Sequence, residues 1–265
     1  MPDWRSYDGV AEIYERIHAP RLADPARDLV RAADPAPGAR VLDVGTGTGV
    51  AAAEALAIVG DGGHVVGIDA SPQMLAVGAR ARPALRLLAA QAIDLPFRDG
   101  SFDAVVGNFV LAHFTKYQTA LWDILRVLRP GGRLALNAWS DGQDELTRVW
   151  LETVWSVVPR EVLEAAIADA VPWQQRFRQR ETLEETLMDA GLRHVRVEQR
   201  QYRFSYALDD YVDGLATWAT GRFVRSMLGD GWGSFWERVR ATFAETFPDP
   251  VNDYRDVLVA VGTKP

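Results

Sequence analysis

The chain contains no cysteine, and only Lys116 and Lys264 among its 29 basic residues are lysines. The lack of thiols excludes disulfides, thiolate nucleophiles and cysteine-bound metals. No stretch approaches the roughly 20 apolar residues of a membrane span, and the first ten residues lack the apolar core of a signal peptide. A net charge of −7 argues against nucleic acid as a partner. We therefore expect a cytoplasmic protein with no membrane or nucleic-acid partner.

Three glycines at alternate positions end the segment from Val41 to Gly49, between a short apolar stretch and an alanine-rich one. A strand that runs through glycines into a helix is typical of a nucleotide site, because the ligand can approach the backbone and the free N–H groups of the helix. The dinucleotide fingerprint would place its third glycine at position 50, where this chain has Val50. Asp43 lies inside the strand, where a carboxylate suits a cationic amino group better than a pyrophosphate. The pattern favours S-adenosylmethionine over NAD.

Asp69 ends the second predicted strand, 20 residues after Gly49. An acid at this place is positioned to accept hydrogen bonds from both ribose hydroxyls of a bound nucleotide, whether NAD or S-adenosylmethionine. Ser71 and Pro72 have the residue types of a helix N-cap and first helical position. They predict a helix over 72–80.

Alternation of apolar stretches and helical patterns predicts an α/β fold with a Rossmann-like, doubly wound, mostly parallel sheet. Two later strands, 195–202 and 257–263, complete a seven-stranded sheet. The earlier strands are expected at 40–44, 64–69, 85–90, 102–108 and 133–138. Helices are expected at 49–59, 72–80, 116–128, 143–157, 160–170, 180–190, 208–228 and 232–246. We divide the chain into an N-terminal helical cap (1–37), a cofactor-binding core (38–140), a helical lid and substrate region interleaved with late strands (141–255) and a final strand (256–265).

Four segments, VLDVGTGTG, VVGIDASPQML, AIDLPFRDGSFDAVVGNFVLAHF and LRPGGRLALNAWS, follow one another as in class I S-adenosylmethionine-dependent methyltransferases. The chain resembles most the small-molecule subgroup that includes the ubiquinone and menaquinone biosynthesis enzymes, over residues 38–140. The resemblance implies that S-adenosylmethionine is the cofactor. The residues that it implies for the cofactor are Gly45, Thr46 and Gly47 along the methionine part with Asp43 beneath, Asp69 at the ribose, Ala70 and Met74 against the adenine, Gln91 and Ala92 near its amino group, and Asn108 and Phe109 facing the methyl group.

Gln91 departs from the acid that the family usually has at this position. Its side-chain carbonyl can still accept a hydrogen bond from the adenine amino group, without the charge. The backbone of Ala92 could also serve.

Several residues are candidates for catalysis or substrate binding. His113, where the family often has histidine, could act as a general base or could be a structural histidine that bonds to the backbone of a loop. Tyr14 corresponds to an N-terminal tyrosine that the family often has near the cofactor, or it could have only a packing role. His18, Trp139 and Arg222 could contact the substrate, although Arg222 also suits a solvated helix face. We expect no metal, because no histidine-rich spacing offers ligands.

Sixteen of the 26 aromatic residues fall within 141–255, which predicts either an aromatic core or a large apolar pocket. The sequence thus favours methyl transfer from S-adenosylmethionine to an O, N or C atom of a small, largely apolar molecule, such as a secondary metabolite or a quinone-like compound. Three alternatives stay open. They are a methyltransferase-like protein that catalyses a cyclisation or other non-methyl reaction, an NAD-dependent oxidoreductase, and a non-catalytic binding module.

Overall fold

A computed structural model describes residues 3–140, 142 and 144–265. They form a seven-stranded sheet in the order β3-β2-β1-β4-β5-β7-β6. The first five strands are parallel, and β7 runs antiparallel to both β5 and β6. The strand order reverses between β1 and β4, which confirms the predicted doubly wound sheet. The strands are β1 Arg40–Val44, β2 His64–Asp69, β3 Arg86–Ala89, β4 Phe102–Gly107, β5 Leu128–Trp139, β6 Arg193–Tyr206 and β7 Val251–Thr263.

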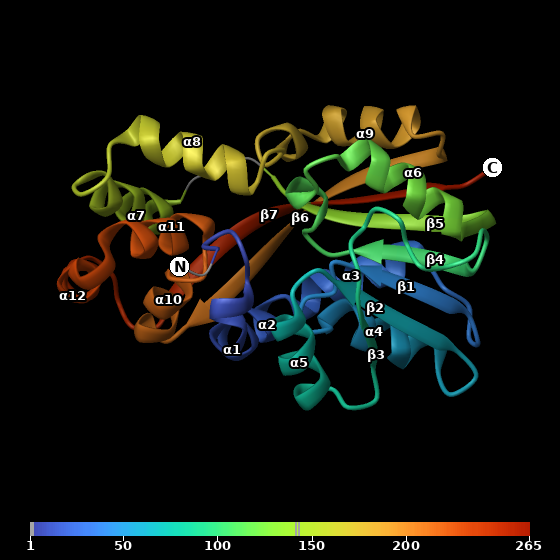
Figure 1. The fold of residues 1–265 in the computed structure, drawn as a ribbon, viewed down its shortest axis with the longest axis horizontal. Coiled ribbons are helices and arrows are strands. Elements are labelled where there is room, and N and C mark those ends of the chain that lie inside the picture. The colour runs from blue at the N-terminus through green and yellow to red at the C-terminus, as the bar shows by residue number, and fades with distance from the viewer. Residues whose placement is uncertain (1–2, 141, 143) are drawn as a thin grey trace.

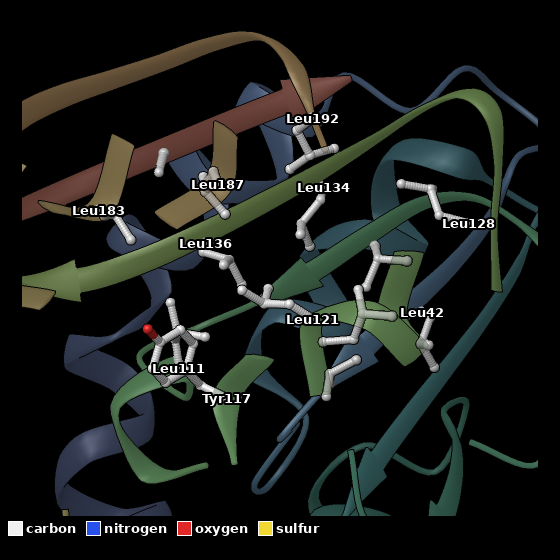
Figure 2. Packing of buried hydrophobic residues seen from close by; sticks show 14 of the residues in the cluster. Leu42, Leu111, Tyr117, Leu121, Leu128, Leu134, Leu136, Leu183, Leu187 and Leu192 are labelled. Carbon is white, nitrogen blue, oxygen red and sulfur yellow. The ribbon is translucent and has the colours of Figure 1, made fainter. Parts of the chain in front are cut away.

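Helices cover both faces of this sheet (Figure 1). On β5, Leu134 and Leu136 are buried with α6 and α9 on one face, while Ala135 between them is buried with α3 and α4 on the other. Figure 2 shows the first face, where leucines from the strands and both helices meet. Because successive strand residues point to opposite faces, a strand covered on both sides is apolar throughout. The covering helices are α3 Ala23–Ala33, α4 Val50–Val59, α5 Pro72–Ala81, α6 Tyr117–Val127 and α9 Arg180–Asp189.

The last two strands are longer than the sequence predicts. They pair with each other from Arg193 and Thr263 out to Tyr206 and Val251, well beyond the parallel strands. The final strand therefore begins at Val251, within the segment 141–255 assigned to the lid and substrate region and before the expected start at residue 257. The end of the β6–β7 pair at Tyr206 and Val251 places Phe204 and Tyr206 in a separate hydrophobic core among the late helices.

The late helices gather at one end of the sheet, around the end of the β6–β7 pair at Tyr206 and Val251 (Figure 1). We call them the helical extension. The expected single helix over 208–228 is wrong, because the chain turns between Leu215 and Ala219. Gly221 packs so tightly against this turn that a Cβ there would collide with the carbonyl oxygen of Leu215. The extension consists of α7 Glu145–Trp155, α8 Arg160–Ala170, α10 Leu208–Leu215, α11 Ala219–Leu228 and α12 Trp232–Thr246.

The N-terminal segment connects the helical extension to the core. The Asp8 carboxylate accepts hydrogen bonds from the Ser71 hydroxyl (2.5 Å) and the Gln73 amide (3.3 Å) at the start of α5. On the other side, Arg16 forms an ion pair with Asp213 of α10 (3.1 Å). The segment comprises η1 Asp8–Val10, α1 Ala11–Ile13, η2 Tyr14–His18 and α2 Ala19–Arg21 before α3. In the described part of the chain, every helix is too short or too polar to cross a membrane.

Candidate functional site

The glycine loop joins β1 to α4 and bends sharply at each glycine. Gly45, Gly47 and Gly49 have φ angles of +67°, +58° and +94°. This left-handed region is open to glycine without steric cost, which explains the three alternate glycines. A Cβ on Gly45 would also collide with the Val110 side chain, so the loop approaches the end of β4 closely.

Asp43 lies beneath the loop with no exposed surface. Its Oδ2 accepts hydrogen bonds from the Thr46 hydroxyl (2.6 Å) and the Ala52 amide (2.9 Å), which ties the loop to α4. Burial raises the pKa of Asp43 to about 7. Its Oδ1 accepts no hydrogen bond from the residues that the structure describes.

Asp69 lies at the end of β2, beside the loop. Its Oδ2 accepts a hydrogen bond from the Gly47 amide and its Oδ1 one from the Ser71 amide, each at 2.8 Å. Burial raises the pKa of this carboxyl. Ser71 accepts a hydrogen bond from the Met74 amide, which confirms it as the N-cap of α5. A carboxylate has about four lone-pair directions, so two remain for other donors.

Met74 and Tyr14 cover the loop. A Cβ built on Gly47 would lie 3.3 Å from the Met74 methyl and 4.0 Å from a ring carbon of Tyr14. Tyr14 reaches this place from the N-terminal segment, and burial raises the pKa of its hydroxyl. The structure thus brings Gly47, Asp69, Met74 and Tyr14 together at one edge of the sheet.

The residues suggested for the adenine end also lie at this edge. Ala70 is exposed directly after β2, while Gln91 (exposed) and Ala92 (half-buried) follow β3. Because Asp69 and Ala89 are register partners at the ends of β2 and β3, the residues after both strands share one side of the glycine loop.

Asn108 and Phe109 follow β4, next to the end of β5. Phe109 has a φ of +58°, a strained conformation for a side chain of this size, and its ring stacks on Trp139 at 4.0 Å. Asn137 is almost fully buried and donates to the Asn108 carbonyl oxygen at 2.9 Å. This hydrogen bond orients the side-chain amide of Asn108, whose NH2 group makes no hydrogen bond to the described residues and can donate to a ligand.

His113 ends the short η3 helix (Leu111–His113), and its ring centre lies 5.9 Å from that of Tyr7. Burial, and secondly the charge of Arg222, lower the pKa of His113 to about 4. The ring is therefore neutral at neutral pH. Among the described residues we find no hydrogen bond to it, in contrast to the structural alternative of a backbone-bonded ring.

His18 and Arg222 are both nearly fully buried. The His18 Nε2 lies 2.6 Å from the Thr217 hydroxyl, and burial lowers the pKa of His18 to about 3. Arg222 donates to the Trp4 carbonyl (2.8 Å) and to the Thr217 carbonyl. The solvated-face interpretation of Arg222 is wrong, because α11 packs its guanidinium against the N-terminal segment. These contacts occupy two of the five N–H donors of the Arg222 guanidinium.

Arg21 and Asp253 lie near the site, although no local sequence pattern marks either of them. Arg21 of α2 lies over the Trp139 ring at 5.6 Å, and its side chain is only 9% exposed. It is paired with Asp253 of β7, which has no exposed surface. In a chain so rich in arginine, no local pattern distinguishes Arg21 from its exposed counterparts.

Comparison with known proteins identifies the family. The model of the methyltransferase domain family matches residues 42–136. A demethylmenaquinone methyltransferase of Clavibacter sepedonicus is 32% identical over 204 residues, which cover 71% of this chain and 81% of that protein. One of Beutenbergia cavernae is 46% identical over 104 residues, which span 39% of this chain and only 42% of the relative.

A solved structure shares the fold over the whole length. A phosphoethanolamine N-methyltransferase of Haemonchus contortus, in complex with S-adenosylhomocysteine, superimposes with a TM-score of 0.59 at 17% identity, covering 100% of this chain and 61% of that one. This likeness concerns the fold. The sequence relatives show that the chain belongs to the class I S-adenosylmethionine-dependent methyltransferases, in the subgroup of the ubiquinone and menaquinone biosynthesis enzymes.

Proposed function

We propose that the edge formed by Gly47, Asp69, Met74 and Tyr14 binds S-adenosylmethionine. The observation that carries this proposal is the Asp69 carboxylate, which two backbone amides hold beside the loop with two lone-pair directions left. Two neighbouring ribose hydroxyls supply the two donors that these directions need. The absence of a side chain at Gly47 lets Met74 and Tyr14 pack on the loop backbone, so both side chains border the edge beside Asp69.

The rest of the cofactor assignment follows the same edge. Gly45 and Thr46 continue the wall of the methionine part, and Asp43 supports it from beneath with an unused oxygen. Ala70, Gln91 and Ala92 border the adenine, where an exposed glutamine can accept from the amino group. Asn108 and Phe109 close the site at the end of β4.

We infer that the acceptor is a reduced quinone or a similar hydroxylated ring that is methylated at carbon. Relatives that match this chain include demethylmenaquinone methyltransferases and ubiquinone/menaquinone biosynthesis C-methyltransferases. The stacked pair of Phe109 and Trp139 at the ends of β4 and β5 offers a flat apolar wall for such a ring. These names favour neither the cyclisation nor the oxidoreductase alternative.

S-adenosylmethionine supplies an electrophilic methyl group on a sulfonium centre, so the protein has chiefly to orient the acceptor and exclude water. Phe109 and Trp139 would hold the acceptor ring. Because burial lowers the pKa of His113 to about 4, its neutral ring is a weak base that would accept a hydrogen bond from an acceptor hydroxyl. The NH2 group of Asn108 can donate to an acceptor oxygen.

Calorimetry with S-adenosylhomocysteine and with NADH tests the cofactor. Replacing Asp69 with alanine should weaken S-adenosylhomocysteine binding by about 100-fold, because two hydrogen bonds to a charged group are lost. Asp61→Ala is the matched control, since Asp61 is exposed in the turn before β2. Binding of NADH without binding of S-adenosylhomocysteine would contradict the proposal.

The acceptor is tested by incubation with methyl-labelled S-adenosylmethionine and reduced 1,4-naphthoquinone, followed by mass spectrometry of the product. We expect one labelled methyl group on a ring carbon. Exclusive labelling of an oxygen atom would refute carbon methylation while leaving the cofactor assignment intact.

A further inference from the structure

A group of buried polar atoms lies where the N-terminal segment meets the end of the β6–β7 pair at Tyr206 and Val251. Within the described residues, the Arg21 Nε and the hydroxyls of Tyr206 and Tyr211 have no hydrogen-bond partner, and both carboxylate oxygens of Asp253 have only ion-pair contacts with guanidinium groups. The relative exposure is 8% for Tyr206, 3% for Tyr211 and 0% for Asp253. Buried polar groups are almost always hydrogen-bonded, so this concentration of unpaired ones indicates a missing partner. We call these four residues the distal polar cluster.

The four residues come from separate elements but face one another. The Arg21 guanidinium lies 5.4 Å from the Tyr206 ring centre, and its Nη2 lies 3.6 Å from Asp253 Oδ2. The rings of Tyr206 and Tyr211 meet edge to face at 5.5 Å. The four side chains therefore lie together, and Arg21 and Asp253 are close enough for their charges to act on both tyrosine hydroxyls.

The charges around the cluster balance. Arg255 has its Nε 2.7 Å from Asp253 Oδ1 and its Nη2 3.2 Å from Asp144 Oδ2, so two guanidinium groups face two carboxyl groups. Burial raises the pKa of both tyrosines, whose hydroxyls therefore keep their protons at neutral pH and can donate. The cluster offers donors and acceptors without net charge, which matches a neutral oxygen group better than an ion.

Aromatic side chains connect the cluster to the sheet edge. Arg21 lies over the rings of Trp139 (5.6 Å) and Phe204 (4.7 Å). Trp139 in turn stacks on Phe109, directly after β4. An elongated molecule with a flat apolar body and one polar end matches this sequence of contacts.

We propose that the distal polar cluster binds a neutral hydroxyl or carbonyl oxygen of the methyl acceptor, while the apolar body of the acceptor lies along Trp139 and Phe109. This inference rests on the proposed function and deepens it, since it names the chemical group by which the acceptor is recognised. The Arg21 Nε and the two tyrosine hydroxyls donate to the ligand oxygen. Asp253 accepts where the ligand group is a hydroxyl.

The test compares two probes of similar shape, 1,4-naphthoquinone and naphthalene, by saturation-transfer NMR in the presence of saturating S-adenosylhomocysteine. We expect the wild-type protein to bind the quinone more tightly. Tyr206→Phe and Tyr211→Phe should each weaken quinone binding, and the double variant should do so by about 10-fold, with naphthalene binding unchanged. Tyr254→Phe, on the exposed side of β7, is the matched control and should change neither.

Affinity for S-adenosylhomocysteine reports whether each variant is folded. If the double variant fails this check, the single variants and the preference of the wild-type protein for the quinone decide the question. Equal binding of both probes, or quinone binding insensitive to the hydroxyls, would show that the cluster holds only water and would overturn the inference. Failure of the wild-type protein to bind S-adenosylhomocysteine would instead refute the proposed function.

Discussion

Gly78 of α5 and Gly233 of α12 offer one substitution in two contrasting settings. Both lie in helices, where alanine in place of glycine normally stabilises by about 0.5–1 kcal/mol. A Cβ on Gly233 would meet no atom within 4 Å. A Cβ on Gly78 would lie 2.6 Å from the carbonyl oxygen of Thr48, in the glycine loop, and about 0.8 Å inside an ordinary contact distance of 3.4 Å.

Gly78→Ala must therefore push α5 away from the loop. We expect it to lower the free energy of unfolding by about 1–2 kcal/mol, because a typical overpacking cost of about 1–3 kcal/mol exceeds the gain in helix propensity. The Thr48 carbonyl also accepts a hydrogen bond from Arg82 (3.1 Å), which is paired with Glu15 of the N-terminal segment. The displacement should thus also weaken S-adenosylhomocysteine binding.

Urea unfolding and calorimetry measure both effects. Gly233→Ala should raise the unfolding free energy and leave cofactor affinity unchanged. The two variants should therefore differ by about 2 kcal/mol in unfolding free energy, or roughly 4–8 °C in melting temperature. If Gly78→Ala stabilises as much as the control and binds S-adenosylhomocysteine normally, close packing of α5 on the loop does not position the cofactor site.

Two further predictions concern buried side chains. Arg222→Met should lower the free energy of unfolding by about 2–4 kcal/mol in urea titration, because two carbonyl oxygens lose the guanidinium that donates to them. Arg225 is exposed on the same helix, so Arg225→Met should change the free energy of unfolding by no more than about 0.5 kcal/mol. Equal effects of the two substitutions would contradict a structural role of Arg222. For His113, the unfolded state gains a proton below about pH 6.5 and the folded state only below about 4. As the pH decreases from 6.5 to 4, the free energy of unfolding of the wild-type protein should therefore fall by about 3 kcal/mol relative to that of His113→Gln, measured by urea titration of both proteins. The same pH dependence in both proteins would refute this prediction.

Local signals predicted the core of the sheet well. β1 and β2 begin and end where the sequence indicates, because each is a short apolar run that glycines or a cap delimit. Ser71 and Pro72 start α5 through contacts within a single turn. The glycine loop is equally local, since its geometry depends on residues that are neighbours in the chain.

The misses share a different origin. The turn after Leu215 contains no glycine or proline, so only the packing of α11 back onto α10 reveals it. The outer halves of β6 and β7 pair only with each other, and the apolar side chains there belong to the core of the extension. Arg222 is buried because its guanidinium donates to the backbone carbonyl oxygens of Trp4 and Arg5, which are more than 200 residues away in the chain.

The sequence by itself determined the fold class, the family and the edge of the sheet at which the cofactor should bind, because strand, loop and cap signals act over a few residues. The tertiary structure alone decided which side chains meet across the site. Tyr14 reaches Gly47 from the N-terminal segment, and Arg21 meets Tyr206 and Asp253 from the far end of the chain. Such contacts depend on how packed helices orient side chains, and a contact between distant residues leaves no periodic pattern in the sequence.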